Sequence, residues 1–246
     1  MESPLTEPTV TSTGQVRKLF DAKAATWSAK YAPGGRLTDR LAQLATAVEQ
    51  QTTTGTRVLD LGCGTGDLAR CLAAGHRRVT GCDISVEMLV HAAHADQAQV
   101  VEWTRLDPSW HTLPFSDRTF GAIVASSILE YLDDPVAVLR ECARVLQPGG
   151  TLMCTVPDLR HPVRWLECLA AVAAHGPLGK ALGHRHPRLS GYITYLQVSR
   201  QRHSARWWME AAVRAGLQSS PAPLVATERA PLRLFGFIKP SSAGLT

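Results

Sequence analysis

Apolar and polar residues alternate along this chain in the order expected of an α/β protein. Five short, largely apolar runs predict strands buried in a parallel sheet, because such strands are covered on both faces. Residues 67–74 and 134–146 instead repeat apolar positions at helical spacing. Strands that alternate with helices in this way predict one sheet with helices on its faces. The five predicted strands are residues 57–61, 78–82, 99–104, 121–125 and 151–156.

The segments on either side of this core are less regular. We expect residues 1–13, rich in Thr, Ser, Pro and Glu, to form a flexible tail. Apolar residues at helical spacing predict helices over 15–31 and 37–51, so that residues 14–51 make an N-terminal helical segment. The C-terminal elements expected are a helix at 205–215 and strands at 217–227 and 231–239.

Residues 159–203 exceed an ordinary connection between a strand and a helix. They contain a helical pattern at 165–174 and a piece rich in Gly, His and Pro at 176–187. We interpret this segment as an insertion that caps a site and supplies substrate specificity.

Basic residues dominate the insertion, where Glu167 is the single acid between Leu159 and Arg206. Two explanations stay open: a solvated basic surface, or attraction of an anionic substrate or of an acidic carrier protein that holds it. Nucleic acid is not expected, because no interleaved aromatic platform accompanies the charges. The basic residues are Arg160, Arg164, Lys180, Arg185, Arg188, Arg200, Arg202 and Arg206.

Composition limits the class of protein. The 246 residues, 45% of them hydrophobic, suffice for one α/β domain with additions. No apolar run is long enough to span a bilayer, and the N-terminus lacks the basic head and apolar stretch of a signal peptide. The six cysteines have no C-x-x-C spacing, so we expect reduced thiols in a cytoplasmic protein. The oligomeric state, monomer or homodimer, does not follow from the sequence.

The first candidate for chemistry lies where the first strand ends. Asp60 is followed by Gly62, Gly64 and Gly66, and then by the helical run that starts at Asp67. Glycines in such a turn let the backbone approach a ligand closely. The spacing G-x-G-x-G differs from the dinucleotide fingerprint, and the carboxylate of Asp60 would repel a diphosphate but attract a cation. The turn therefore favours a positively charged nucleoside.

A second carboxylate, Asp83, ends the second predicted strand about 20 residues after the glycine turn. A carboxylate at this position accepts both ribose hydroxyls in nucleotide-binding folds. The alternative role is an N-cap of the next helix, which Ser85 also suits.

These segments resemble class I S-adenosylmethionine (SAM) dependent methyltransferases, in particular the small-molecule enzymes of quinone and natural-product biosynthesis. The resemblance covers roughly residues 15–157 and rests on five motifs. They are F-D-x-x-A-x-x-W-x-x-x-Y at 20–31, D-L-G-C-G-T-G-D at 60–67, G-C-D-I-S-x-x-M-L at 81–89, L-P-F-x-D-x-x-F at 113–120 and L-R-E-x-x-R-V-L-x-P-G-G-x-L at 139–152.

The resemblance implies a fold and a division of the chain. The fold is α/β: a seven-stranded, mostly parallel Rossmann-like sheet whose last strand is antiparallel and lies between strands five and six. Residues 14–51 would form a helical cover, and residues 52–246 the SAM-binding domain with the cap insertion at 159–203.

The resemblance also implies SAM as the cofactor and S-adenosylhomocysteine as its product. For Arg36, an exposed arginine is the open alternative to a contact with the cofactor carboxylate. Ile84 and Met88 would flank the adenine, and Asp107 would meet its amino group. The residues assigned to the cofactor are Asp60, Gly62, Cys63, Gly64, Asp83, Ile84, Met88, Leu106, Asp107, Ser126, Tyr31 and Arg36.

Catalytic candidates come from the turn after strand four and from the start of the insertion. Glu130 is the first choice for a base because its position follows from the fold, and Tyr131 and His161 are further candidates. Some related quinone O-methyltransferases bind a divalent metal through E-x-x-E-H at this turn. Here the aligned residues are Ser127, Glu130 and Tyr131, so we expect no metal.

The leading hypothesis is therefore an enzyme that transfers methyl from SAM to a small molecule by direct in-line displacement. Oxygen is the first candidate for the acceptor atom, with nitrogen and carbon open. Ser126-Ser127-Ile128-Leu129 replaces an N-P-P-Y-type tetrapeptide, which argues against adenine or glutamine amide N-methylation. Two alternatives remain: a SAM-binding enzyme with another reaction, such as a cyclisation, and a non-catalytic SAM-binding regulatory partner.

Overall fold

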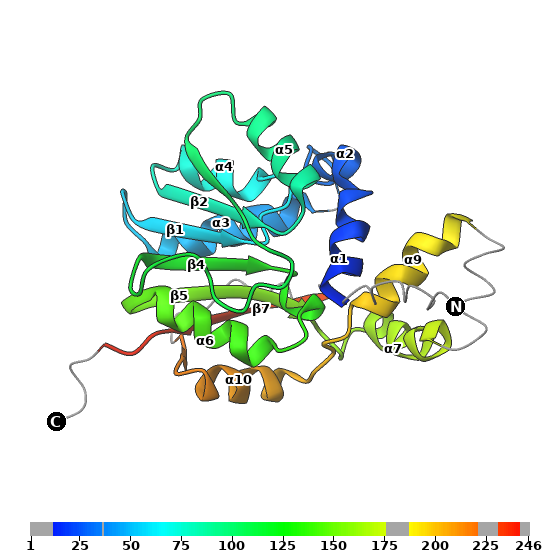
Figure 1. Ribbon diagram of the computed structural model, residues 1–246. Helices are drawn as coiled ribbons and strands as arrows, with labels where there is room; N and C mark the ends of the chain where they lie inside the picture. The colour runs from blue at the N-terminus through cyan, green and yellow to red at the C-terminus, as the bar shows by residue number, and fades with distance from the viewer. Residues whose placement is uncertain (1–11, 36, 176–186, 221–230, 242–246) are drawn as a thin grey trace, which may run out of the picture.

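The computed structural model describes residues 12–35, 37–175, 187–220 and 231–241. Their centre is a seven-stranded sheet of order β3-β2-β1-β4-β5-β7-β6 (Figure 1). Neighbours among β1 to β5 pair in parallel, whereas β7 is antiparallel to both β5 and β6, as the resemblance implied. The strands are β1 Arg57–Leu61, β2 Arg78–Asp83, β3 Val101–Arg105, β4 Phe120–Ser126, β5 Leu146–Pro157, β6 Gln218–Ser219 and β7 Leu232–Ile238.

Helices cover both faces of the sheet and divide its core in two (Figure 1). Side chains alternate along β1, so Val58 packs with Val48 and Leu72 on one face, and Leu59 packs with Leu139 and Trp208 on the other. The helices are α1 Ser12–Asp21, α2 Ala24–Trp27, η1 Ser28–Lys30, α3 Thr38–Gln51, α4 Asp67–Ala74, α5 Val86–Ala95, η2 Leu129–Tyr131, α6 Pro135–Val145, α7 Pro162–His175, α9 Pro187–Val198 and α10 Ala205–Arg214.

Side-chain caps explain where several helices begin. Ser85 accepts a hydrogen bond from the backbone N–H of Met88, and Asp134 accepts one from Ala137 ahead of a proline at the first helical position. Each of these caps satisfies a backbone donor that has no partner inside its helix.

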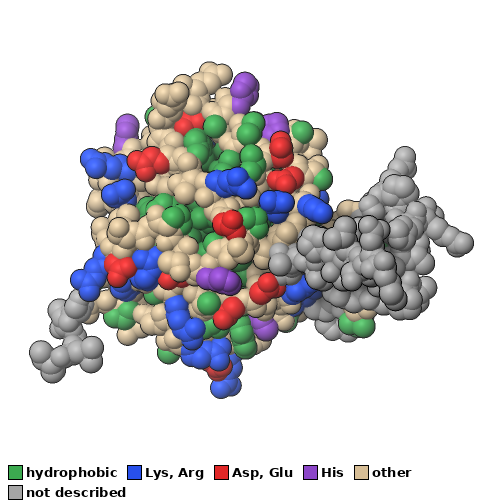
Figure 2. Space-filling view, in the orientation of Figure 1, with side chains coloured by type: hydrophobic (Ala, Val, Ile, Leu, Met, Phe, Trp, Pro, Cys, Tyr) green, Lys and Arg blue, Asp and Glu red, His purple; other side chains and the backbone are tan. Residues whose placement is uncertain are grey.

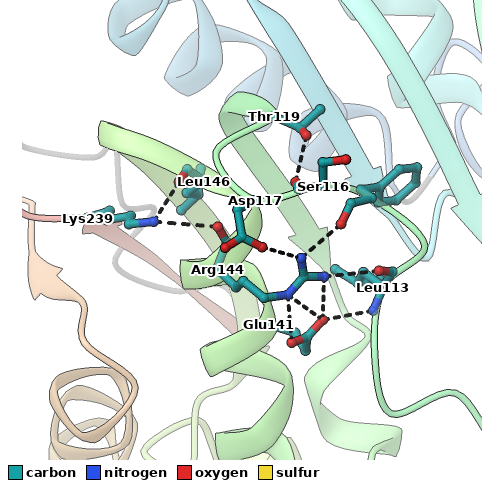
Figure 3. A network of polar contacts seen from close by, with 9 residues as sticks. Leu113, Ser116, Asp117, Thr119, Glu141, Arg144, Leu146 and Lys239 are labelled. Atoms are coloured by element: carbon teal, nitrogen blue, oxygen red, sulfur yellow. Dashed lines mark hydrogen bonds and ion pairs between the residues drawn. The ribbon is translucent and has the colours of Figure 1, made fainter.

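Arg144 in α6 fixes the segment that leads into β4 (Figure 3). Its guanidinium pairs with Glu141 and Asp117 at 2.8 Å and donates to the carbonyl oxygens of Leu113 and Phe115. Arg144 belongs to the motif at 139–152, and these contacts give that motif a scaffolding role.

Three regions differ from the sequence-based expectation. The helix expected at 15–31 is broken into α1, α2 and η1, and the break lets Trp27 turn back onto Phe20, with ring centroids 5.4 Å apart. Helix α9 was not predicted. The strand expected at 217–227 is described only as β6, because residues 221–230 lie outside the described residues. Most of the tail expected at 1–13 also lies outside them.

The surface has no single-sign field on the face drawn in Figure 2, where basic and acidic side chains are interspersed. Of the helices in the described ranges, none is long and apolar enough to cross a membrane.

Candidate functional site

A cavity of about 660 Å³ opens at the carboxyl ends of β1, β2 and β4. Its lining comes mainly from three parts of the chain: the turns that follow these strands, the N-terminal segment from α1 to α3, and helices α7 and α9. Further lining residues are Leu106, Trp110, Pro231 and Leu232. This volume lies within the range of ordinary small-molecule sites, and the carboxyl edge of a parallel sheet is where such folds bind ligands.

The turn after β1 requires its glycines. Gly62, Gly64 and Gly66 have φ values of +74°, +54° and +72°, which other residues rarely adopt. A Cβ on Gly62 would lie 2.9 Å from Cδ1 of Ile128, and one on Gly66 would lie 2.3 Å from the ring of Trp103. The turn can therefore follow this path, with Gly62, Cys63 and Gly64 along the cavity, because its glycines carry no side chains.

Asp83, at the end of β2, holds this turn in place. Its carboxylate accepts hydrogen bonds from the N–H groups of Gly64 and Ser85, each 2.9 Å long. Burial raises the pKa of Asp83, and these backbone donors oppose the increase. The N-cap of α5 is Ser85, so capping does not account for the carboxylate of Asp83. Asp83 lines the cavity together with Ile84 and Met88.

Asp60 is buried at the cavity, with a relative exposure of 2%. Its Oδ2 atom has no hydrogen-bond partner among the described residues. Burial, and secondly the charge of Asp83, raise the pKa of Asp60 to about 7. A buried carboxylate oxygen without a donor is costly, so this atom suits a ligand that brings a positively charged donor.

Arg40 in α3 supplies the opposite charge in the same cavity. Its Nη1 donates to Oγ of Ser127 at 2.7 Å, while its buried Nε has no partner within the described part of the chain. Ser127, in the turn after β4, has a φ of +54°, and its N–H donates to Oγ1 of Thr155 at 2.9 Å. Strained residues of this kind cluster at functional sites.

Arg40 was not found by sequence reasoning, which selected Arg36 one helical turn earlier. Arg36 lies outside the described residues. Tyr31, the other candidate from the N-terminal segment, lines the cavity, and burial is the main reason that its pKa is raised.

Aromatic side chains form a row along the cavity. Phe20 contacts Trp27 and Tyr131 edge to face, with ring centroids 5.4 and 5.2 Å apart. Tyr131 continues to Tyr195 at 6.4 Å, and Tyr195 stacks on Tyr192 at 5.9 Å. All five line the cavity, which gives it a wall suited to a flat apolar molecule.

Glu130, which precedes Tyr131 in the chain, also lines the cavity and is 2% exposed. Its carboxylate accepts a 2.7 Å hydrogen bond from the hydroxyl of Ser199. Burial raises the pKa of Glu130, and the hydrogen bond from Ser199 opposes the increase. For the neighbouring Tyr131, burial raises the pKa well above its ordinary value.

Arg164 and Glu167 of α7 close the same end of the cavity. Nη1 of Arg164 donates to Glu167 at 2.7 Å and to the hydroxyl of Tyr195 at 2.6 Å. The charges of α7 are thus paired inside the protein. Sequence reasoning had assigned these residues only to a basic insertion, because a pairing with α9 cannot be read from a linear pattern.

Two sequence-based candidates do not line the cavity. Asp107 is exposed, and its carboxylate accepts hydrogen bonds from the N–H and the hydroxyl of Ser109 at 2.8 and 2.5 Å. From the same loop, Leu106 and Trp110 line the cavity instead. Nδ1 of His161 accepts the N–H of Val163 at 3.3 Å, at the start of α7. Ser126, after β4, does line the cavity.

Comparison with known proteins shows what this part of the chain is similar to. A family model described as a methyltransferase domain matches residues 59–154, from β1 to β5. A C-methyltransferase of ubiquinone and menaquinone biosynthesis from Desulfotalea psychrophila is 39% identical to this chain over 109 residues, 43% of this chain and 44% of the relative. A demethylmenaquinone methyltransferase from Tropheryma whipplei is 33% identical over 155 residues, 63% of each chain.

The chain therefore spans from less than half to about two thirds of the length of these relatives. The methyltransferase fold extends further. Magnesium protoporphyrin IX methyltransferase from Synechocystis PCC 6803, with bound S-adenosylhomocysteine, superposes with a TM-score of 0.66 over 91% of this chain and 98% of that one, at 16% identity.

This part of the chain is similar to class I, SAM-dependent methyltransferases, as the motifs indicated. Its residues fit this cofactor on their own chemistry. SAM carries an ammonium group, a carboxylate, a positive sulfur and a ribose with two hydroxyls. The cavity offers an unpaired carboxylate oxygen at Asp60, an unpaired guanidinium nitrogen at Arg40 and a carboxylate at Asp83 beside the glycine turn.

Proposed function

We propose that this chain is a SAM-dependent methyltransferase that acts on a small-molecule acceptor, with oxygen as the first candidate for the acceptor atom. The observation that carries the proposal is the unpaired, buried Oδ2 of Asp60 at the carboxyl edge of the sheet. A protein that bound no cationic ligand there would leave a buried carboxylate without compensation.

In this proposal the cofactor contacts follow from the lining of the cavity. Asp60 accepts the ammonium group, and Asp83 accepts the ribose hydroxyls while it holds the N–H of Gly64. Arg40 binds the carboxylate, and Tyr31 completes that wall. Ile84, Met88 and Leu106 pack on the adenine, and Cys63 and Ser126 border the cofactor from the turns after β1 and β4.

SAM supplies a methyl group that is already reactive because it is bonded to a positive sulfur. The task of the protein is therefore to orient the acceptor, exclude water and remove a proton where the acceptor carries one. Orientation alone can supply a large part of the rate increase. Phe20, Trp27 and Tyr131 would hold a flat acceptor and exclude water, and Glu130 would accept its proton.

Residues 14–51 act as the cover of the site in this proposal, and residues 159–203 act as its cap. The contribution of both segments to one cavity supports these roles, because α1 to α3 and α7 to α9 enclose it from two sides. The paired charges of Arg164 and Glu167 at the acceptor end favour an uncharged acceptor over an anionic one. The quinone-related names of the relatives make hydroquinones the first acceptors to test.

Calorimetric titration with SAM and S-adenosylhomocysteine tests the cofactor, on the wild type and on Asp83→Ala. We expect micromolar binding by the wild type and a loss of about 30-fold or more in the variant, since hydrogen bonds to a charged group contribute about 2 kcal/mol. Incubation with SAM labelled in its methyl group and a panel of hydroquinones then tests the transfer. Folded wild type that binds neither nucleoside would overturn the proposal, and binding without transfer to any acceptor would leave only the cofactor site standing.

A further inference from the structure

Arg164 of α7 is held on three sides at the wall of the cavity. Its Nη1 donates to Oε2 of Glu167 at 2.7 Å and to the hydroxyl of Tyr195 at 2.6 Å, and its Nε donates to the carbonyl oxygen of Pro231 at 2.9 Å. All four residues line the cavity. These bonds fix the guanidinium in one orientation and leave Nη2 as its one nitrogen without a hydrogen bond to a described residue.

The hydroxyl of Tyr195 provides a second free donor at the same place. Tyr195 comes from α9, which lies beside α7 (Figure 1). Its hydroxyl accepts a hydrogen bond from Arg164, whereas no described residue accepts the proton of this hydroxyl. Burial, and secondly the charge of Glu130, raise the pKa of Tyr195 to about 12, so the proton stays in place at neutral pH. Because Nη1 and Nη2 of Arg164 share one carbon atom, the two free donors lie side by side.

The charges around these donors select against an anionic ligand. Glu167 neutralises Arg164 directly, with 10% and 12% of their side chains exposed. The second carboxylate is that of the buried Glu130, which the charge of Arg202 reaches. Since these four charges cancel, a ligand carboxylate would be buried here without compensation. A neutral carbonyl oxygen has two lone pairs, so it can accept from both free donors at no such cost.

Helix α9 places the free donors one helical turn from the proposed base. The N–H of Ser199 donates to the carbonyl oxygen of Tyr195 at 2.9 Å, which completes this turn. The hydroxyl of Ser199 donates to the carboxylate of Glu130 at 2.7 Å. Residues at a spacing of four lie about 5–6 Å apart on one face of a helix. This is close to the span between two oxygen atoms on opposite sides of one aromatic ring.

We propose that Arg164 and Tyr195 determine specificity by holding a neutral carbonyl oxygen of the methyl acceptor. Nη2 of Arg164 and the hydroxyl of Tyr195 donate to this oxygen, while the hydroxyl to be methylated lies toward Glu130. We call Arg164 and Tyr195 the carbonyl clamp. The assignment rests on the proposed function and narrows the acceptor to flat aromatic ketones and quinones that carry a hydroxyl group.

Three matched probes test the carbonyl clamp by calorimetry on the full chain, with and without S-adenosylhomocysteine. The first probe is an acetylnaphthol with its hydroxyl and acetyl groups on opposite sides of one ring. The second is the isopropylnaphthol of nearly the same shape, which lacks the carbonyl. The third is the hydroxynaphthoate of the same substitution, which carries a charge.

Two variants each remove one donor of the clamp. Tyr195→Phe removes the hydroxyl but keeps the ring that stacks on Tyr192. Arg164→Met/Glu167→Met removes both charges of the pair, so that neither is left buried alone. The matched control is Tyr192→Phe, because Tyr192 lines the same wall and makes no hydrogen bond with Arg164. Unchanged thermal unfolding shows that a variant is folded, and Tyr195→Phe decides alone if the double variant is not.

We expect the wild type to bind the acetylnaphthol at least about tenfold more tightly than the isopropylnaphthol, because the isopropyl group leaves both donors unpaired. The hydroxynaphthoate should bind more weakly than the acetylnaphthol. In both clamp variants the ratio of the first two affinities should fall to about threefold or less, whereas Tyr192→Phe should keep the ratio of the wild type. A merely structural role would weaken the binding of both probes alike and would leave the ratio unchanged.

The proposal is overturned if the wild type binds the acetylnaphthol no more tightly than the isopropylnaphthol, or binds neither. It is also overturned if the hydroxynaphthoate binds most tightly, or if the ratio stays the same in Tyr195→Phe or falls equally in Tyr192→Phe. Failure of the proposed function has a separate signature. In that case calorimetry detects no SAM binding by the wild type, whereas the preference among the probes is also measured without a nucleoside.

Discussion

The carboxylate of Glu130 and the hydroxyl of Ser199 are joined by a 2.7 Å hydrogen bond, although 69 residues separate them in the chain. The backbone strengthens this connection, because the carbonyl oxygen of Glu130 accepts the N–H groups of Arg200 and Gln201. Glu130 and Ser199 are both buried. The turn after β4, which borders the cofactor cavity, is therefore fixed to the segment that leaves α9.

Glu130→Gln separates the chemical role of this residue from its structural one. The amide keeps an oxygen for the hydroxyl of Ser199 but cannot take a proton. We expect methyl transfer to an acceptor hydroxyl to fall by about 100-fold or more, with SAM affinity unchanged. Since burial raises the pKa of Glu130 above its usual 4.5, the rate should rise with pH through that raised value in the wild type. Single-turnover rates across pH measure both effects.

Ser199→Ala is the matched variant for this test. It leaves the carboxylate of Glu130 in place but removes its hydrogen bond, so we expect a loss of about 1–2 kcal/mol in the free energy of unfolding. Full activity in Glu130→Gln would show that Glu130 has only a structural role, through its hydrogen bond with Ser199.

The raised pKa of Asp60 leads to a prediction of how cofactor binding depends on pH. Without ligand its carboxyl is protonated below about pH 7, because burial and Asp83 raise its pKa. A cationic ligand binds the carboxylate form, so SAM affinity should increase about tenfold as the pH rises from one unit below this pKa to above it. Calorimetry in buffers of different ionisation enthalpy should also detect a proton released on binding.

Asp60→Asn provides the contrast, since its affinity for SAM should be weak and should lack this pH dependence. A raised pKa also means that the folded state without ligand loses stability as pH rises from about 4 to about 7. Above pH 7, therefore, the variant without ligand should unfold at a higher temperature than the wild type. Equal melting temperatures there would contradict the assignment of a buried charge to Asp60.

Sequence patterns can predict the place of a residue in the fold where that place depends on neighbouring residues in the chain. Gly62, Gly64 and Gly66 follow a strand and precede a helix, and Asp83 ends the next strand, so short patterns suffice to bring them to one edge of a sheet. The antiparallel direction of β7 and its place between β5 and β6 followed from the family resemblance, because the pattern of β7 alone does not fix its neighbours.

Residues whose position depends on tertiary contacts could not be read in this way. The helix expected at 15–31 breaks because Trp27 packs on Phe20, and the helical spacing of apolar residues does not reveal this ring contact. Arg40 lines the cavity through a contact with Ser127, 87 residues later. Asp107 instead turns toward Ser109, because a local hydrogen bond satisfies its carboxylate outside the cavity.

The variant Arg40→Met tests whether Arg40 contacts the cofactor carboxylate, when its affinity is measured for two ligands with and without that carboxylate. We expect SAM to bind about 10- to 100-fold more weakly to the variant, since a charge-assisted hydrogen bond is lost. Decarboxylated SAM lacks the group in question and should bind the variant and the wild type equally. Arg17→Met serves as the control, because Arg17 also has a buried Nε without a hydrogen-bond partner, although it lies 4.0 Å from Asp21, and it does not line the cavity. Equal weakening for both ligands would show that Arg40 acts only through Ser127.

Gly66→Ala tests whether the glycine turn is required by the fold as well as by the ligand. Its φ of +72° costs an alanine about 1–2 kcal/mol, and the new Cβ would lie 2.3 Å from the ring of Trp103. Overpacking of this kind adds about 1–3 kcal/mol, so urea unfolding should show a total loss of about 2–5 kcal/mol. Gly55→Ala isolates the backbone term, because Gly55 has a φ of +80° with nothing within 4 Å of its Cβ position. We expect that variant to lose only about 1–2 kcal/mol. If the two variants lose the same free energy of unfolding, the ring of Trp103 moves aside without an energetic cost. Gly66 is then required for its backbone conformation alone.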